Sequence, residues 1–395
     1  MALLGIVLVA LNLRIAVTVV SPITDAIRPD VALTQGALEV LAAAPPLVFA
    51  LSGLAAAGLG RRFGLEIMLA AAMALSAAGE LLRALSSTPA AFLAWTVPIM
   101  VGAGLGNVLC PPAIKKHFPD RIGLVTGLYT GCISFSTALP PLFVARIAEA
   151  AGWRPALGVW VVLTVAAVIP WAWIVFHPER RGLRLEAIQR RLDPRRPGEA
   201  PPALAAPVWR APLAWCLALV FACNSLIAYS LFAWLPDVLR EAGFATDRAA
   251  SYLAILSIAS LPGSLLVPVV IARVRRVWLL PPLFFAGYVV GFLGLALSPA
   301  HGTLAWILAS RVGDCFFPFA ITLIALRTRT LGGATALSGF VQSLGYLLAA
   351  AGPWLIGALF SATGSWHVPM LALLVFPPVQ LAAATVAARL GRLNI

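Results

Sequence analysis

One arginine, Arg14, stands near the centre of the first apolar stretch of this chain. Between Met1 and Val20 the only strongly polar residues are Asn12 and Arg14. At about 1.5 Å of rise per residue, a helix from the N-terminus carries Arg14 roughly two-thirds of the way across a hydrocarbon layer of about 30 Å. An ionised side chain at that depth needs a water-filled cavity or a partner, and the default interpretation is a site on a solute path.

The chemistry of a guanidinium favours an anionic solute at Arg14. The group is planar, always protonated and able to grip a small anion through two parallel hydrogen bonds. The alternative is a structural Arg14, held by a carboxylate or by carbonyls at a helix end. Asn12 lies roughly 200° around the helix from Arg14, so we expect it to meet another helix instead of the solute.

Other polar and aromatic residues inside apolar stretches are candidates for the wall of the same site. Asn107 lies just before Pro111 and Pro112, where freed backbone carbonyls need water or neighbours. A buried Asn serves equally well as a hydrogen-bonding contact between helices, and both interpretations stay open. Gln342 and Tyr346 are spaced i, i+4 and therefore share one helix face. The predicted solute-binding residues are Arg14, Asn107, Tyr129, Tyr229, Gln342 and Tyr346.

Asp314 is the one carboxylate that the sequence places well inside an apolar stretch. It follows Arg311 at a spacing of i, i+3, so the two side chains can pair. If transport is coupled to protons through a carboxylate, Asp314 is the first candidate and Arg311 its partner; the alternative is a static ion pair. Glu80 and Arg83 repeat this spacing, and we expect them to form a surface pair at the outer end of their helix.

The composition places these residues in a membrane protein. Of 395 residues, 61% are hydrophobic and only 11% are charged, with a mean hydropathy of +0.95. An ordinary soluble domain has about 25% charged residues. The formal charge of +13 does not indicate nucleic-acid binding, because the basic residues fall in short loops. Five cysteines lie in apolar stretches without metal-ligand spacing, so we expect neither a metal site nor a cofactor.

Apolar stretches of about 20 residues can be counted directly, and there are twelve. We therefore predict an all-α polytopic membrane protein with twelve transmembrane helices. The expected spans are residues 2–22, 37–58, 65–85, 91–113, 122–145, 155–176, 211–235, 248–272, 278–298, 303–326, 334–360 and 366–388.

The distribution of lysine and arginine predicts the orientation. Most of them lie in the loops after even-numbered spans and at the C-terminus, which by the positive-inside rule places both termini in the cytoplasm. The longest break, residues 177–210, is rich in Arg and Pro. We interpret it as a cytoplasmic linker that touches anionic lipid; a nucleic-acid-binding tail is the alternative.

The chain repeats itself across this linker. Thr34 and Arg61 are 27 positions apart, as are Thr246 and Arg273, and each pair brackets the second span of its half. The turns at residues 152–155 and 364–369 both carry Gly, Trp and Pro before the last span of a half. Such internal symmetry is typical of transporters whose two bundles rock about a central site. The predicted units are a six-helix bundle at 1–176, a linker at 177–210 and a second six-helix bundle at 211–395.

With these features the chain resembles the major facilitator superfamily, and more narrowly the cyanate porter (CynX/NimT) family. The loop at residues 58–64 resembles the superfamily's loop motif, although it lacks the usual Asp ahead of Arg61 and Arg62. The resemblance implies that these two arginines form a gating loop. The narrower resemblance is carried by residues 11–14, 106–119, 127–129, 229–236, 337–346 and 352–353.

The favoured hypothesis is a secondary active transporter that moves a small solute by alternating access around Arg14. The resemblance implies a cyanate-like anion, a short carboxylate or a nitroimidazole-like compound. One alternative is a drug or amphipathic-solute exporter of the same fold with a structural Arg14; another is a membrane receptor or an intramembrane enzyme. The spans lack the HExxH, GxSxG and P-loop motifs, so we expect no enzyme activity. We expect a monomer in the inner (plasma) membrane, in contact with lipid and with possible proton coupling, and no nucleic-acid partner.

Overall fold

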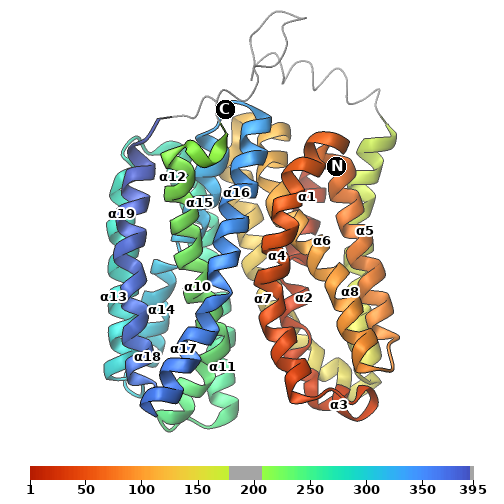
Figure 1. The fold of residues 1–395 in the computed structure, drawn as a ribbon, viewed down its shortest axis with the longest axis vertical. Helices are drawn as coiled ribbons and strands as arrows, with labels where there is room; N and C mark the ends of the chain where they lie inside the picture. The colour runs from red at the N-terminus through yellow and green to blue at the C-terminus, as the bar shows by residue number, and fades with distance from the viewer. Residues whose placement is uncertain (178–206, 392–395) are drawn as a thin grey trace, which may run out of the picture.

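The computed structural model describes residues 1–177 and 207–391, and the described residues form helices without β-strands (Figure 1). Within this part of the chain, ten helical stretches are individually long and apolar enough to cross a membrane. The interrupted first span and helix α4 complete the twelve membrane-spanning segments, which form two six-helix bundles. The predicted linker falls almost entirely outside the described residues.

The first half contains spans one to six. Span one consists of two short helices, and the next five spans are single long helices. These elements are α1 (Ala2–Asn12), α2 (Ile15–Thr18), α3 (Thr24–Val31, outside the spans), α4 (Gln35–Phe63), α5 (Leu65–Ala84), α6 (Pro89–His117), α7 (Ile122–Ala151) and α8 (Trp153–Phe176).

The second half contains spans seven to twelve, and four of its spans are divided into two helices. The elements are α10 (Pro212–Glu241), α11 (Thr246–Ile258), α12 (Leu261–Arg273), α13 (Leu280–Leu297), α14 (Thr303–Gly313), α15 (Phe316–Leu326), α16 (Leu331–Ala349), α17 (Ala351–Thr363), α18 (His367–Ala372) and α19 (Phe376–Arg389). Met1 and the end of α19 lie at the same end of the molecule, here termed the termini end; the opposite end is the far end (Figure 1).

Glycines let the third and fourth spans of each half pack closely. A Cβ atom at Gly79 of α5 would lie 2.9 Å from the Trp95 carbonyl oxygen of α6. At Gly291 of α13 it would lie 2.7 Å from the Ser310 nitrogen of α14. The two glycines are 212 positions apart, the same offset that separates Thr34 from Thr246. The repeat that the sequence indicates therefore extends to the packing of neighbouring helices.

The two halves pack against each other along the part of the molecule nearer to the termini end. A Cβ atom at Gly339 of α16 would lie 3.3 Å from the Gly53 carbonyl oxygen of α4. On the other side of the molecule, a Cβ atom at Gly127 of α7 would lie 2.5 Å from the Leu265 carbonyl oxygen of α12. Small residues thus allow backbone-to-backbone contact between the halves.

At the far end, each half closes with a tryptophan corner before its last span. In the first half, Trp153 Nε1 and Arg154 Nη1 each donate to Asp30 Oδ2 at 2.8 Å. In the second half, the Trp366 backbone nitrogen donates to Glu241 Oε1 at 3.1 Å. An acidic residue after the first span of each half therefore holds the turn before its last span. The hydrogen bonds from Trp153 and then Arg154 lower the pKa of the Asp30 carboxyl.

Candidate functional site

Arg14 lies at a break in the first membrane span. Helix α1 ends at Asn12 and α2 begins at Ile15, so the predicted continuous span is interrupted at Arg14. Its Nη1 donates to the Tyr229 hydroxyl of α10 at 3.0 Å, and its Nη2 to the Tyr346 hydroxyl of α16 at 3.4 Å. Three of the predicted residues thus meet between the two halves of the molecule.

Aromatic rings surround the Arg14 guanidinium. Phe49 of α4 lies with its ring centroid 6.0 Å from Arg14 Cζ, and the Phe49 and Tyr346 rings meet edge to face at 5.3 Å. Phe221 packs against the other side of Tyr346 at 5.0 Å. Tyr346 and Phe49 are buried, whereas Arg14 and Tyr229 keep exposed surface. The charge is therefore partly exposed and lies beside aromatic rings.

Phenol hydroxyls are the partners of the Arg14 charge. Among the side chains that the structure describes, no carboxylate forms an ion pair with Arg14. Two neutral oxygens do not neutralise a guanidinium, whose ordinary partner in a low-dielectric region is an anion. The arrangement can therefore accept an external anion through donors that are already pointed at one place.

Two backbone carbonyls of α6 join the halves beside this site. Pro111 and Pro112 lack the N–H groups that would bond to the carbonyls of residues 107 and 108 in a regular helix. Instead, Gln342 Nε2 of α16 donates to the Asn107 carbonyl at 3.0 Å, and Ser338 Oγ donates to the Val108 carbonyl at 2.7 Å. These contacts are here termed the carbonyl seam.

The other three predicted solute-binding residues lie in or next to the carbonyl seam. The Tyr129 hydroxyl also faces the Asn107 carbonyl, at 3.4 Å, and the Asn107 side chain donates to Ala103 of its own helix at 3.2 Å. Tyr129, Asn107 and Gln342 are each 1% exposed. These three side chains are buried at or beside the contact between the halves, whereas Arg14 and Tyr229 are partly exposed.

Asp314 lies at the break between α14 and α15. Its Oδ2 is 3.3 Å from Arg311 Nη1, and its Oδ1 accepts a hydrogen bond from Asn224 Nδ2 at 3.1 Å. The Tyr288 hydroxyl donates to Asn224 Oδ1 at 2.8 Å. The two oxygens of an ionised Asp314 therefore each have a donor.

The expectation that Glu80 and Arg83 form a surface pair is wrong. Glu80 is 3% exposed and Arg83 is 1% exposed, because α6 and α8 cover α5 on that face. Thr164 Oγ1 of α8 lies 2.8 Å from Glu80 Oε2 and 2.6 Å from Asn12 Oδ1. The expectation that Asn12 meets another helix is confirmed. The single Thr within the apolar α8 was the available sequence signal for this buried cluster.

The end of α4 is near a second charged cluster that sequence reasoning missed. Arg61 and Arg62 themselves are exposed. Glu66, at the start of α5, is fully buried and lies 2.6 Å from Lys116 Nζ and 3.0 Å from His117 Nε2. The adjacent Lys115 crosses to the second half, where its Nζ is 2.8 Å from Thr328 Oγ1. The basic run at the end of α6 was the signal for this cluster.

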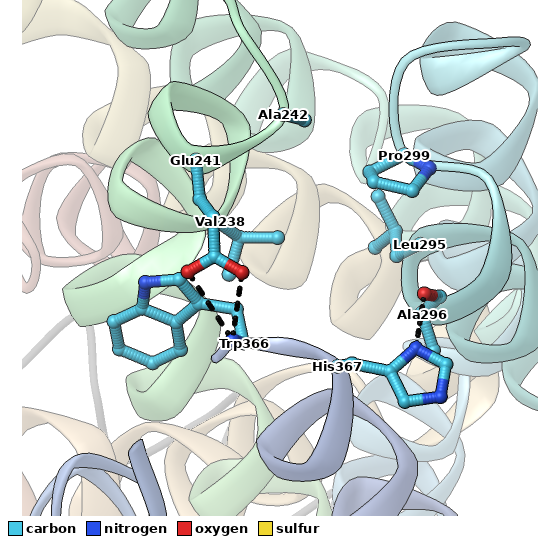
Figure 2. Close-up of a pocket in the computed structure, with 8 residues that line it drawn as sticks. All are labelled: Val238, Glu241, Ala242, Leu295, Ala296, Pro299, Trp366 and His367. Atoms are coloured by element: carbon cyan, nitrogen blue, oxygen red, sulfur yellow. Dashed lines mark hydrogen bonds between the residues drawn. The ribbon is translucent and has the colours of Figure 1, made fainter. Parts of the chain in front are cut away.

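A small pocket of about 120 Å³ lies at the far end of the second half (Figure 2). Figure 2 shows Glu241 holding the Trp366 backbone on one side and His367 Nδ1 bonded to the Ala296 carbonyl on the other, at 2.8 Å. The pocket belongs to the tryptophan corner, and its lining contains none of the predicted solute-binding residues.

Residues 2–350 match the family model described as "Major Facilitator Superfamily". The chain belongs to this superfamily. It is 34% identical to the "2-nitroimidazole transporter" of Escherichia coli (strain K12), over 93% of this chain and 90% of that protein. It is 32% identical to the "Uncharacterized transporter YycB" of Bacillus subtilis (strain 168), over 98% and 92% of the two chains. The "Cyanate transport protein CynX" of Escherichia coli is 27% identical over 92% and 91%.

Solved superfamily structures share the fold. The proton:xylose symporter XylE superposes with a TM-score of 0.75 at 16% identity, covering 97% of this chain and 94% of XylE. The transporter FucP in the outward conformation superposes with a TM-score of 0.66 at 15% identity, covering 98% and 97%. The twelve-helix superfamily fold and a multi-pass membrane protein are therefore confirmed.

Proposed function

We propose that this protein is a secondary active transporter for a small anion, cyanate-like or a short carboxylate, or for a nitroimidazole-like compound. The observation that carries the proposal is Arg14, a partly exposed cation at a helix break with only phenol partners among the described side chains. Two relatives that match more than 90% of this chain, a 2-nitroimidazole transporter and a cyanate transport protein, support these solute classes. The superfamily assignment supports transport by alternating access, which needs no covalent step and no cofactor.

The geometry suggests how a solute is held. Arg14 comes from the first half, whereas Tyr229 and Tyr346 come from the second half. An anion at Arg14 accepts from the guanidinium and from the two phenol hydroxyls, which turn from acceptors into donors. Because its ligands then come from both halves, occupancy is sensitive to how the halves rock. The aromatic walls also suit a flat ring such as a nitroimidazole.

The carbonyl seam and the Lys115–Thr328 contact form the closed gate of this conformation. Both join the halves, and opening the termini end requires both to break. By the positive-inside rule we place the termini end in the cytoplasm and the protein in the inner (plasma) membrane. The conformation is then outward-facing, with Arg61 and Arg62 flanking the closed gate. We further propose that the transporter acts as a monomer, because each half contributes to one central site.

We propose that Arg311 and Asp314 form a static pair that fixes the break between α14 and α15. Arg311 and Asn224 supply donors to both Asp314 oxygens, which matches an ionised carboxylate held in place. Asp314 as the proton-coupling group is the alternative, and the pH-gradient dependence of transport in Asp314→Asn separates the two.

Thermal stabilisation of the purified protein tests the solute class. A ligand that binds only the folded state raises the free energy of unfolding, by about 2.7 kcal/mol at a ligand concentration of 100 times Kd. The melting point rises with it. The panel contains cyanate, nitrate, short carboxylates and neutral nitroheterocycles. We expect an anion to stabilise wild type and to have no effect on Arg14→Ala. Stabilisation only by neutral or cationic aromatics, retained in Arg14→Ala, would instead support the exporter with a structural arginine.

A further inference from the structure

The buried contact between α1, α5 and α8 contains one hydrogen too few for an ionised Glu80. Thr164 Oγ1 is 2.6 Å from Asn12 Oδ1 and 2.8 Å from Glu80 Oε2, both ordinary lengths for O–H···O hydrogen bonds. A third acceptor, the Trp160 carbonyl, lies at 3.3 Å. A threonine hydroxyl carries a single hydrogen and can satisfy only one of these acceptors. With Glu80 ionised, one short contact would join two lone pairs.

The orientation of Asn12 is fixed by its other contacts. Its Nδ2 is 2.7 Å from the Leu8 carbonyl and 3.4 Å from the Leu163 carbonyl, which can only accept. The amide oxygen therefore faces Thr164, and a flipped amide cannot supply the missing hydrogen. The remaining source is the carboxyl group of Glu80 itself.

We propose that Glu80 is a proton-binding site of this transporter, linked through Thr164 and Asn12 to the helix break that carries Arg14. In the protonated state, Glu80 Oε2–H donates to Thr164 Oγ1, and the Thr164 hydroxyl donates to Asn12 Oδ1. Every short contact then has its hydrogen. Asn12 is the last residue of α1, so the proton on Glu80 fixes the helix end next to Arg14.

Arg83 supplies a partner for the ionised state. It lies one helical turn after Glu80 and is buried, and its Nε and Nη1 atoms have no hydrogen-bond partner among the described residues. No ion pair joins the Glu80 and Arg83 side chains in this conformation. After losing its proton, Glu80 gains from turning to Arg83, because a buried guanidinium is stabilised by a carboxylate. Thr164 then loses its contact with Glu80.

Among the described side chains on the helices that pack around Glu80, Arg83 is the charged group that lies near it. From α8 it faces Thr164, and Arg154 of that helix bonds to Asp30 at the far end. From α1 it faces the uncharged Asn12 through Thr164. The charged residues described on α6, Lys115 and Lys116, lie at the termini end, beside Glu66 and Thr328, as do the arginines at the end of α4.

Asn12 and Asn224 occupy matching places in the two halves, 212 positions apart, but their clusters differ in hydrogen count. Asn224 receives a hydrogen from the Tyr288 hydroxyl and donates its own to Asp314. That cluster is complete with an ionised carboxylate, whereas the Glu80 cluster is complete only with a protonated one. The comparison assigns proton binding to the first half, the half that also carries Arg14.

Infrared difference spectra between wild type and each variant test the proton on Glu80 directly and need no solute. We expect wild type at pH 7 to show the C=O stretch of a protonated carboxylic acid, and this band to be absent in Glu80→Gln. In Thr164→Val the band should persist at a shifted frequency, because its hydrogen-bond partner is gone. Glu149→Gln, which removes an exposed glutamate, is the matched control and should keep the band. The proposal would be overturned if neither Glu80→Gln nor Thr164→Val altered a carboxylic-acid band of wild type. It would also be overturned if wild type showed only an ionised carboxylate at Glu80.

A transport experiment tests the link to coupling and rests on the proposed function. Gln keeps an N–H donor for Thr164 and mimics the protonated acid permanently. In proteoliposomes, Glu80→Gln should retain solute exchange at equilibrium and lose at least tenfold of the accumulation driven by a pH gradient. Accumulation equal to wild type would overturn the coupling role. If wild type also failed to exchange the tested solute, this would count only against the proposed solute. The proton site would stand, since the infrared band does not depend on the solute.

Discussion

The proposed anion binding by Arg14 depends on the planar shape of its guanidinium group as well as on its positive charge. Lys at this position keeps the charge but loses the planar fork that reaches Tyr229 and Tyr346 together. We expect Arg14→Ala to abolish uptake and Arg14→Lys to lose about tenfold or more, since a hydrogen bond to a charged group contributes about 1.5–3 kcal/mol. Initial rates in proteoliposomes measure both variants. Arg248→Lys, at an exposed arginine of the second half, is the control and should transport normally. Normal uptake by Arg14→Ala would rule out the anion site.

The Arg311–Asp314 pair makes a different prediction at the same scale. If the pair is static, Asp314→Asn leaves the buried Arg311 without its carboxylate and lowers the melting point. Breaking a fully buried ion pair costs about 3–5 kcal/mol, and we expect a smaller cost here because the Asp314 side chain is 17% exposed. Transport that survives in Asp314→Asn should keep its dependence on the pH gradient. Accumulation that no longer responds to the gradient in this variant would show that Asp314 is the coupling group.

Single residues differ in how well the sequence reveals them. Arg14 can be found from sequence because one charge in an apolar stretch is conspicuous. Glu80 was misplaced because its spacing from Arg83 is that of a surface pair, and burial by α8 depends on tertiary packing. Thr164 stands out in the sequence only as the single threonine of the apolar α8, which does not indicate its partners. Its role appears only when Asn12 and Glu80, distant in sequence, meet at its hydroxyl.

At the scale of elements, the two prolines of α6 determine the carbonyl seam. The sequence predicts that carbonyls are freed before Pro111 and Pro112, and the structure shows their partners on α16. The i, i+4 spacing of Gln342 and Tyr346 correctly predicts a shared polar face. On this face, Gln342 contacts the seam and Tyr346 contacts Arg14. The local spacing does not specify this division, because it depends on how the two halves approach each other.

The seam predicts the effect of removing one donor. Gln342→Leu leaves the Asn107 carbonyl with only the longer contact from Tyr129, and an unmade buried hydrogen bond costs about 1–3 kcal/mol. The population with an open termini end should therefore grow. Electron spin resonance distances between labels at exposed positions Arg121 and Arg275 should show a larger separated fraction.

Gln380→Leu is the matched control for the seam. Gln380 is also buried and donates to a carbonyl, that of Val220, but both residues belong to the second half. Its loss should leave the distance distribution between the halves unchanged. An equal shift in both variants would mean that the seam does not hold the gate.

The tryptophan corner of the first half is expected to respond to acid. Its hydrogen bonds lower the pKa of Asp30, so the ionised carboxyl contributes stability above its unfolded value of about 3.9, and this is lost as pH falls through the lowered folded pKa. Wild type should melt above Asp30→Asn at pH 7, and the difference should shrink towards zero in strong acid. In Trp153→Phe the pH dependence should be weaker, because the main hydrogen bond is gone. A constant difference at all pH values would contradict this account.

At the scale of the whole molecule, hydropathy counting gives the correct architecture of twelve spans in two bundles. It fails where a span is interrupted, as at Arg14 and at Asp314, because a broken helix keeps the same composition as a continuous one. The repeat offset seen in Thr34 and Thr246 recurs in the packing of Gly79 and Gly291. Internal repetition is therefore a stronger guide to helix packing than the length of apolar stretches alone.

The use of main-chain acceptors in the seam has a consequence for mutational tolerance. A carbonyl is present whatever residue occupies position 107 or 108, so most substitutions there keep the acceptors of the gate. Its donors on α16 are side chains, Ser338 and Gln342, and are lost with a single substitution. Within the carbonyl seam, random mutagenesis that selects for altered gating should therefore recover changes at Ser338 and Gln342 of the second half more often than at positions 107 and 108 of the first.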